Sequence, residues 1–409
     1  MTPAALLLAA LALAGLVITS LPVALLERLR RRRRPFSRGP RGRASAPSPR
    51  AASTPDRPRL SVLKPLKGLD DGLEENLASF AALRGIDYEV VLSVADAGDP
   101  ALDVVDRIRA RHPEAPFVLV VGGAPEGRIG NPKVARLVAA SRVARGDLFL
   151  VSDSNVRVAP DAVADTVALL DDPTVGCVSN LFVGAGARDL GAVVESLHLL
   201  TFVVPGNVLA AWRGIPCVVG KSMALPRRVH DAIGGFAAFG DVLAEDQAIG
   251  LAVREAGFRV LLSPVVVENV VERRTVKRAL DRQVRWGKIR FAFSKGLFAG
   301  EVLMNPFPLA LLSALLALAG RSPGSGPLAS FALLSLLVRL LQASLLGRLC
   351  GAPLSAVGLL AVPLKDLLQL ATQLVPFISQ EVVWHGHRAR IGRGTLLVAV
   401  ERPVRLAGA

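Results

Sequence analysis

The strongest constraint on the fold is a nearly uninterrupted apolar segment near the N-terminus, residues 4–26. Its length matches the roughly 20 residues that a helix needs to cross the hydrocarbon core of a bilayer. A secretory signal peptide carries its positive charges before the apolar stretch and a small-residue cleavage site after it. Here the arginines follow the segment, from Arg28 to Arg34. We therefore expect residues 1–27 to be an uncleaved signal anchor, with the N-terminus outside and the chain that follows it cytoplasmic.

Composition favours a membrane protein over a protein that binds nucleic acid. Of the 409 residues, 51% are hydrophobic, and the formal net charge is +15. Many of the arginines flank apolar segments, as membrane topology and anionic lipid require. Aromatic residues make up only 5%, with one tyrosine, so a stacking surface for single strands is not expected. Cys177, Cys217 and Cys350 are too far apart for a metal-ligand motif or a disulfide framework.

The rest of the chain divides into four segments. Residues 28–58 are rich in Arg, Ser, Pro and Ala, which is typical of a flexible linker. In residues 59–295, short apolar runs alternate with longer amphipathic stretches, which predicts strands alternating with helices in a mostly parallel α/β sheet. Residues 296–380 are apolar again, and residues 381–409 form a basic C-terminal tail. The expected strands are residues 60–63, 88–94, 117–121, 148–151 and 175–179, and two of the expected helices are residues 100–110 and 133–144.

The C-terminal apolar part contains three candidate membrane segments, residues 302–318, 328–346 and 356–377. An arginine-rich tail that stays inside needs an even number of crossings after the cytoplasmic part, so one of the three should be re-entrant or interfacial. The last segment holds Lys365 and Asp366 side by side near its middle. Charges at mid-bilayer are costly, so this pair is either an internally neutralised structural pair or a polar floor for a lipid head group.

Two acidic sites follow expected strands, at the sheet edge where ligands of open α/β proteins bind. Asp96 comes just after residues 88–94, where it can accept a hydrogen bond from a base or sugar hydroxyl. Asp99 precedes a proline, which is typical of a helix N-cap. Asp153 comes just after residues 148–151, and it has two interpretations. It belongs to an Asx-turn, or it holds a Mg²⁺ ion, which needs only one or two carboxylates plus substrate phosphates.

Further candidates lie at helix starts and on one basic helix. Asp246 precedes an expected helix, residues 249–256, where it is either an acid favoured by the helix dipole or a general base. Arg282 and Arg285 share one helical face, with Trp286 beside them, and they suit a diphosphate or a sugar, or else an interfacial basic helix. Lys64, in a basic loop after the first strand, and Lys133, at a helix start, are weaker candidates for an anion site.

The order of these residues resembles the ceramide glucosyltransferase family, family 21, a branch of the family 2-like inverting glycosyltransferases with a GT-A fold. That family has three separated aspartates followed by a (Q/R)xxRW motif. The resemblance is close over about residues 1–300 and continues afterwards only in topology. The strings that carry it are "SVLKPLKGLDDGLEENLASF", "NPKV", "VSDSNVRV", "AEDQAIGLAVREAGFRV" and "RQVRWGKIRF".

The resemblance implies a role for each aspartate. Asp96, or Asp99 in its place, would contact the uridine of a UDP-sugar. Asp153 would help to hold the Mg²⁺ or Mn²⁺ ion that bridges the diphosphate. Asp246 would be the general base that deprotonates the acceptor hydroxyl. The second motif departs from Asp-x-Asp, because it reads Asp153-Ser154-Asn155 and so offers the metal fewer carboxylates.

The resemblance also implies a donor-binding set of basic and aromatic residues. Arg282, Arg285 and Trp286 would hold the diphosphate and cover the site, and Lys133 would lie in the nucleotide pocket. Lys64 is assigned to the same donor-binding set. The last motif begins with Arg282 rather than Gln, as in the ceramide branch and unlike most polysaccharide synthases.

We therefore expect a membrane-bound enzyme that transfers a hexose from a UDP-sugar to the primary hydroxyl of a ceramide-like lipid. The expected hexose is glucose, and the configuration at its anomeric carbon would be inverted. The alternatives are transfer of N-acetylglucosamine to a hopanoid polyol, a processive polysaccharide synthase, and a non-catalytic membrane scaffold. The presence of all three aspartates disfavours the scaffold. The high Arg, Ala, Leu and Gly content suggests a GC-rich bacterium, so the expected location is the bacterial inner membrane.

Overall fold

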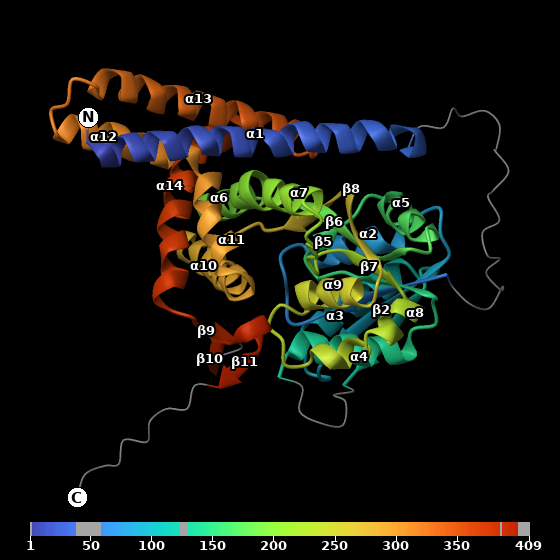
Figure 1. The fold of residues 1–409 in the computed structure, drawn as a ribbon. Helices are drawn as coiled ribbons and strands as arrows, with labels where there is room; N and C mark the ends of the chain where they lie inside the picture. Colours follow the sequence, from blue (N-terminus) through green and yellow to red (C-terminus); the bar gives the residue numbers. More distant parts are fainter. Residues whose placement is uncertain (1, 38–58, 123–129, 385–386, 400–409) are drawn as a thin grey trace, which may run out of the picture.

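The computed structural model describes residues 2–37, 59–122, 130–384 and 387–399. Figure 1 shows two parts: a sheet covered by helices, and a layer of long helices that lies over it. Most of the expected linker, residues 38–58, and the end of the expected tail, residues 400–409, lie outside the described residues. The first helix, α1 (Pro3–Ser37), continues through the arginine run that was assigned to the linker.

The sheet has eight strands in the order β3-β2-β1-β4-β7-β6-β8-β5, so the expected α/β sheet is confirmed as a mixed one. The first four strands in that order are parallel, β7 runs antiparallel to both of its neighbours, β6 and β8 are parallel, and β5 is antiparallel to β8. The strands are β1 (Leu60–Pro65), β2 (Tyr88–Val94), β3 (Phe117–Val121), β4 (Leu148–Val151), β5 (Val156–Arg157), β6 (Val175–Ala185), β7 (Met223–Pro226) and β8 (Arg259–Val270).

Both faces of the sheet are covered by helices, and alternate residues of the central strands therefore enter different cores. Val62 and Leu150 pack with residues of α2 (Leu73–Ala81), α3 (Ala101–Arg111) and α5 (Ala162–Val167). Leu63 and Val151 pack with residues of α4 (Pro132–Val143), α8 (Arg227–Ala232) and α9 (Glu245–Glu255). These strands are continuous apolar runs because both of their faces are buried.

The antiparallel strand β7 determines which residues meet at the sheet edge. Val151, the last residue of β4, pairs with Met223, the first residue of β7. Residues that follow β4 and residues that precede β7 therefore lie at the same edge, where β1 and β2 also end. The sequence predicted this edge from the parallel strands alone. It did not predict that residues preceding β7 also lie there.

The long apolar helices of the helical layer differ in part from the expected segments. Among the described residues, Pro3–Arg31, Leu190–Trp212 and Ser325–Leu349 are long and apolar enough to cross a membrane. In place of the expected segment 302–318, helices that include α11 (Lys295–Gly300) and α12 (Pro306–Ala319) meet at a bend of 72° and form one broken span or a re-entrant loop. Leu190–Trp212, which contains α6 (Leu190–His198) and α7 (Val204–Trp212), was not expected, and 78% of its apolar window is buried inside the protein.

Helix α14 (Ala356–Ile378) buries the charged pair that the sequence placed near its middle. Arg339 of α13 (Ser325–Leu349) contacts both carboxylate oxygens of Asp366, at 3.0 and 3.1 Å. Lys365 Nζ lies 2.6 Å from Asp366 Oδ1, and all three side chains are at most 1% exposed. Gln342 of α13 also donates to Ser20 of α1 at 2.8 Å. These contacts support the structural interpretation of the pair, because Asp366 joins α13 to α14.

Part of the expected basic tail is folded. Residues 381–399 contain a three-stranded sheet of β9 (Glu381–Trp384), β10 (His387–Ile391) and β11 (Leu397–Ala399). Val382 and Ile391 are buried in a small core together with Leu243, which lies just before α9. Apolar residues among the arginines explain why this stretch folds.

We predict that Asp366→Leu destabilises the helical layer. The substitution leaves Arg339 and Lys365 buried without their carboxylate, which typically costs about 3–5 kcal/mol. The midpoint of thermal unfolding in detergent should fall clearly, and replacing all three charged residues by leucine should restore much of it. Asp281, exposed on α10 (Val276–Phe293), is a matched control, since Asp281→Leu removes only a surface ion pair. An unchanged midpoint for Asp366→Leu would contradict this account of α13 and α14.

Candidate functional site

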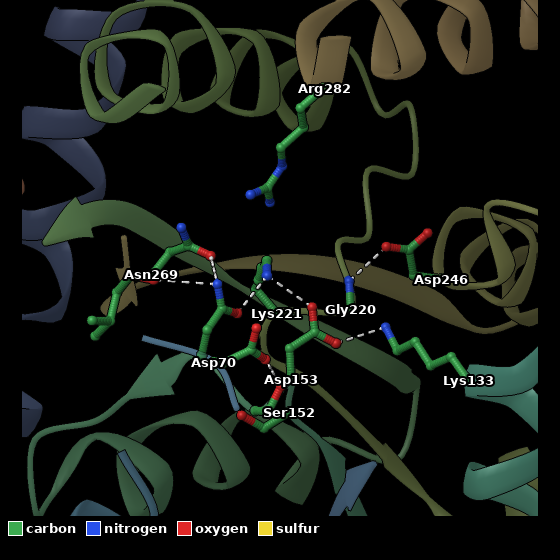
Figure 2. A network of polar contacts seen from close by, with 12 residues as sticks. Asp70, Lys133, Ser152, Asp153, Gly220, Lys221, Asp246, Asn269 and Arg282 are labelled. Carbon is green, nitrogen blue, oxygen red and sulfur yellow. Dashed lines mark hydrogen bonds and ion pairs between the residues drawn. The ribbon is translucent and has the colours of Figure 1, made fainter. Parts of the chain in front are cut away.

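The candidate site lies at the sheet edge where β1 and β4 end and β7 begins (Figure 2). Asp153 lies at its centre, between Lys133 and Lys221, and Asp246 lies beyond Gly220. Arg282 points toward this group from the helix above, α10. The structure therefore brings together Asp153, Lys133, Asp246 and Arg282, which the sequence had placed far apart.

Both carboxylate oxygens of Asp153 are engaged by lysines. Lys133 Nζ lies 2.8 Å from Oδ1, and Lys221 Nζ lies 2.9 Å from Oδ2. Burial alone would raise the pKa of Asp153, but the two ammonium groups hold it well below its usual range. Burial alone would lower the pKa of Lys133, but Asp153 and Glu245 outweigh that effect and raise it. Asp153 and Lys133 are therefore both charged at neutral pH.

Lys221 is the residue that the sequence analysis missed at this centre. Its ammonium group also donates to Asn155 Oδ1 at 2.7 Å, so it binds both ends of the Asp153-Ser154-Asn155 motif. Asn155 is held in turn by its amide, which donates to Asn269 Oδ1 at 3.2 Å. The available signal was a lysine between small residues, Gly220 and Ser222, directly before an apolar strand. Without the antiparallel position of β7, that signal could not be connected to Asp153.

Lys64 supports Asp153 from inside the protein. Its side chain is fully buried, and its ammonium group donates to the Asp153 backbone carbonyl at 2.8 Å. It also lies 3.9 Å from the centre of the Phe80 ring. Burial lowers the pKa of Lys64 to about 7, although Asp153 opposes that shift. Lys64 thus fixes the backbone that carries the carboxylate, and in this conformation its side chain has no surface open to a nucleotide.

Asp246 begins helix α9 and faces the same centre. Its Oδ2 accepts from Gly220 N–H at 2.7 Å, and its Oδ1 accepts from Gln247 N–H at 2.7 Å. Burial, followed by the neighbouring Glu245 carboxylate, raises the pKa of Asp246 to about 6. Glu245 also pairs with Lys133 at 2.8 Å, so one lysine connects the Asp153 and Asp246 sides of the site.

Gly220 leaves room for this connection. A Cβ atom at this position would lie 2.5 Å from Lys133 Nζ, which is closer than any normal contact. The backbone N–H of the same residue holds Asp246. The absence of a side chain at Gly220 therefore lets Lys133 reach Asp153.

Arg282 is aimed by a carboxylate that the sequence analysis did not identify. Glu195 of α6 is buried and pairs with both Arg282 and Arg274, the latter at 2.7 Å. The Arg282 guanidinium lies 4.7 Å from the ring centre of Trp286, which packs edge-on against Phe182 of the sheet. The (Q/R)xxRW motif is thus anchored on one side by Glu195 and on the other by the core.

Arg285 lies on the same helix and is partly buried. Burial, followed by the nearby Arg282 and Arg274 guanidinium groups, lowers its pKa to about 10. The group is still charged at neutral pH, so α10 carries two charged guanidinium groups that lie close to each other.

The two candidates after β2 have different surroundings. Asp99 Oδ1 accepts from the backbone N–H groups of Ala101 and Gly68, each at 2.9 Å, so it stabilises the start of α3 and the loop after β1. Asp96 is exposed, and its Oδ1 accepts only a local bond from Gly98 N–H among the contacts described. Of these two carboxylates, Asp96 is thus the one that remains accessible.

As arranged, Asp153 does not fit a divalent cation. Both of its oxygens are bound by ammonium groups, and the second motif position is an amide that accepts from Lys221. Within residues 2–37, 59–122, 130–384 and 387–399, no group of three or more His, Cys, Asp or Glu side chains could hold a metal ion. The expected Mg²⁺ or Mn²⁺ ion stays a prediction that requires at least one lysine to move.

The C-terminal sheet holds the loop in front of Asp246. Leu243 N–H donates to the Thr395 carbonyl at 2.9 Å, and Ala244 N–H donates to Thr395 Oγ1 at 3.3 Å. Thr395 is buried and has a φ of 62°, which is unfavourable for a β-branched residue. This conformation is kept where Thr395 supports the start of α9, a contact over about 150 residues that no local pattern indicates.

The chain is similar to several glycosyltransferases. A protein named ceramide glucosyltransferase 3 from Caenorhabditis elegans is 28% identical over 262 residues, which cover 63% of this chain and 56% of that protein. An N-acetylglucosaminyltransferase from Rhizobium meliloti is 26% identical over 251 residues, 57% of this chain and 56% of that protein. The chain therefore spans a little over half the length of these relatives.

The solved structures that the chain resembles have lower identity. A mannosyltransferase from Pyrobaculum calidifontis, in complex with GDP-mannose and Mn²⁺, has 21% identity and a TM-score of 0.47, and covers 87% of this chain and 99% of that one. The model of the family described as glycosyl transferase family 21 matches residues 7–397. The match includes the sheet, the site and the helical layer, and the mixed sheet agrees with the expected GT-A-like fold. The chain belongs to glycosyl transferase family 21.

Proposed function

We propose that the protein is a membrane-bound inverting glycosyltransferase that moves glucose from UDP-glucose to the primary hydroxyl of a ceramide-like lipid. The observation that carries this proposal is the Asp246 carboxylate, whose pKa is raised to about 6 and which lies beside a cluster of cationic side chains. The Asp246 carboxylate is suited to accept a proton, and the cationic side chains are suited to bind a diphosphate. Family membership and the relatives named ceramide glucosyltransferase support the choice of donor and acceptor.

The donor would bind along the sheet edge. Asp96 would accept hydrogen bonds from the uridine, and Arg282, held by Glu195, would contact the diphosphate together with Arg285. Trp286 would form a wall of the site. Arginine binds phosphate oxygens with two parallel N–H groups, which fixes the orientation of the leaving group and compensates its negative charge.

The transfer is a single displacement. The acceptor oxygen attacks the anomeric carbon, and its proton passes to Asp246. The bond from the anomeric carbon to the diphosphate oxygen breaks, and UDP leaves with the electron pair. Attack from the side opposite UDP converts an α-linked donor into a β-glycoside. The cationic side chains stabilise the charge that grows on the diphosphate in the transition state.

The helical layer would place this site at the cytoplasmic face of a membrane. Helix α14 runs across the direction of α1 and α13 (Figure 1), and it exposes an apolar stripe along one face. That geometry is typical of a helix lying in the interface. If α14 lies in the interface, the bent α11–α12 pair and α13 make two membrane crossings. The C-terminal sheet would then lie on the same side of the membrane as the site. The stripe consists of Val357, Leu360, Leu364, Leu367, Leu374 and Ile378.

Product analysis tests the function directly. Membranes that contain the protein are incubated with UDP-glucose, UDP-galactose or UDP-N-acetylglucosamine, and with a ceramide or a hopanoid polyol. We expect mass spectrometry to find a hexosylceramide that depends on UDP-glucose and is missing from Asp246→Asn membranes. An N-acetylglucosaminyl hopanoid would support the alternative, transfer of N-acetylglucosamine to a hopanoid. The similar protein from Rhizobium meliloti is named as an N-acetylglucosaminyltransferase. Failure to glycosylate any lipid would contradict the proposal.

The base assignment predicts a loss of turnover without a loss of donor binding. Asp246→Asn should lower kcat by about 10²–10⁴-fold, because an amide cannot accept the proton. UDP-glucose affinity, measured by calorimetry, should stay within a few-fold of the unsubstituted protein. Asp96→Asn is the matched comparison and should mainly raise KM for the donor. Full turnover in Asp246→Asn would show that another group is the base.

The raised pKa of Asp246 predicts an acid limb in the pH profile. The base must be ionised, so kcat/KM should fall as the pH drops below about 6. Glu245→Gln removes a like charge next to Asp246 and should move this limb to lower pH. Glu255→Gln, at the far end of α9, should leave it in place. A limb that does not respond to Glu245→Gln would argue against titration of Asp246.

A further inference from the structure

We infer that Lys133 and Lys221 take the place of a divalent cation at Asp153, so that donor binding and transfer do not depend on added metal. The inference deepens the proposed function and rests on it, because it concerns how the same site holds the donor diphosphate. It gives Lys221, which lies outside the family motifs identified in the sequence, a direct role in binding.

The first observation is that the carboxylate is already bound on both sides. Lys133 and Lys221 approach different oxygens of Asp153, at 2.8 and 2.9 Å. Two ammonium groups and one carboxylate leave one net positive charge. A divalent cation on a single carboxylate leaves the same charge, so the lysines can meet the same electrostatic need of the diphosphate.

The second observation is the change in the motif itself. Its last position is Asn155, an amide, and the oxygen of that amide accepts from Lys221 at 2.7 Å. A second carboxylate at this position would give a metal another anionic ligand. The neutral amide instead completes a binding place for an ammonium group, and Asn269 holds that amide in orientation. The amide at Asn155 and the ammonium group of Lys221 therefore form one unit.

The third observation is that Lys221 cannot leave easily. Its side chain is only 9% exposed, and its position directly before β7 is fixed by the pairing of Met223 with Val151. Moving a buried ammonium group away from its carboxylate leaves an unpaired charge in the interior. A metal ion would have to displace this group, whereas a diphosphate would only have to join it.

The cluster is open toward an incoming anion. Asp153 and Lys133 side chains are 23% and 21% exposed, and Arg282 points toward them from α10 (Figure 2). An ammonium group has three N–H donors, and the contacts of Lys221 to Asp153 and Asn155 use two of them. The diphosphate would accept the third, with Arg282 on its other side. Glu245, which also pairs with Lys133, limits the positive charge on the Asp246 side.

The test uses the full-length protein in detergent, with UDP as the probe for binding and UDP-glucose plus ceramide for turnover. Each is measured in EDTA and in Mg²⁺, for the unsubstituted protein, Lys221→Met and Lys221→Arg. We expect the unsubstituted protein to bind UDP and turn over in EDTA within about twofold of its values in Mg²⁺. Lys221→Met should weaken UDP binding in EDTA by about 10–100-fold, the usual worth of a charged hydrogen bond. Lys221→Arg, which keeps the charge, should retain more of the affinity.

The controls separate this inference from the proposed function. Lys277→Met, which removes an exposed lysine on α10, should change neither measurement. Added Mg²⁺ should improve UDP binding by Lys221→Met more than by the unsubstituted protein, because it can occupy the oxygen of Asp153 that Lys221 releases. If EDTA abolishes both UDP binding and turnover of the unsubstituted protein and Mg²⁺ restores them, the inference is overturned while the proposed function stands. If Lys221→Met binds UDP normally in EDTA, the inference is also overturned.

Discussion

The two ion pairs of Asp153 are the interactions on which the rest of the site depends. They bring a lysine from the start of α4 and a lysine from before β7 to one carboxylate, at the point where β4 ends. Lys64 holds the backbone of the same residue from the interior, and Gly220 leaves the space that Lys133 needs. Since Gly220 N–H also holds Asp246, the proposed diphosphate-binding and proton-accepting parts of the site share one backbone segment. A change at this carboxylate should therefore affect both parts.

The layers around the site have complementary tasks. The sheet fixes the proposed donor side, because the buried strands β1 and β4 determine where Lys64 and Asp153 lie. The helical layer and the C-terminal sheet constrain the other side, since Glu195 aims Arg282 and Thr395 holds the loop before Asp246. Asp246, the proposed base, lies between the sheet and the C-terminal elements that follow the helical layer, which suits the proposed lipid acceptor. Under the proposed function, this arrangement would allow a lipid to approach from the bilayer and a nucleotide to enter from the other side.

Much of this arrangement could be predicted from local sequence patterns. The rest depends on long-range contacts that leave no local pattern in the sequence. The apolar runs at β1 through β4 and the motif order gave the α/β sheet, the family and the positions of Asp96, Asp153, Asp246 and Arg282 relative to strand and helix ends. Lys221 was missed because its meaning comes from β7 running antiparallel beside β4, which no periodicity reveals. Glu195 was missed because it lies in an apolar helix that reads as core, and Thr395 because its segment reads as a basic tail. In each case the partner lies between 66 and 151 residues away in the sequence.

A structure of the protein with UDP and Mn²⁺ tests the role of the two lysines most directly, since manganese can be located by its anomalous signal. We predict that Lys133 and Lys221 keep their contacts with Asp153, that Lys221 and Arg282 lie within hydrogen-bond distance of the diphosphate, and that no manganese peak lies on Asp153. A manganese ion bound to Asp153 and bridging the diphosphate, with the two lysines turned away, would contradict it.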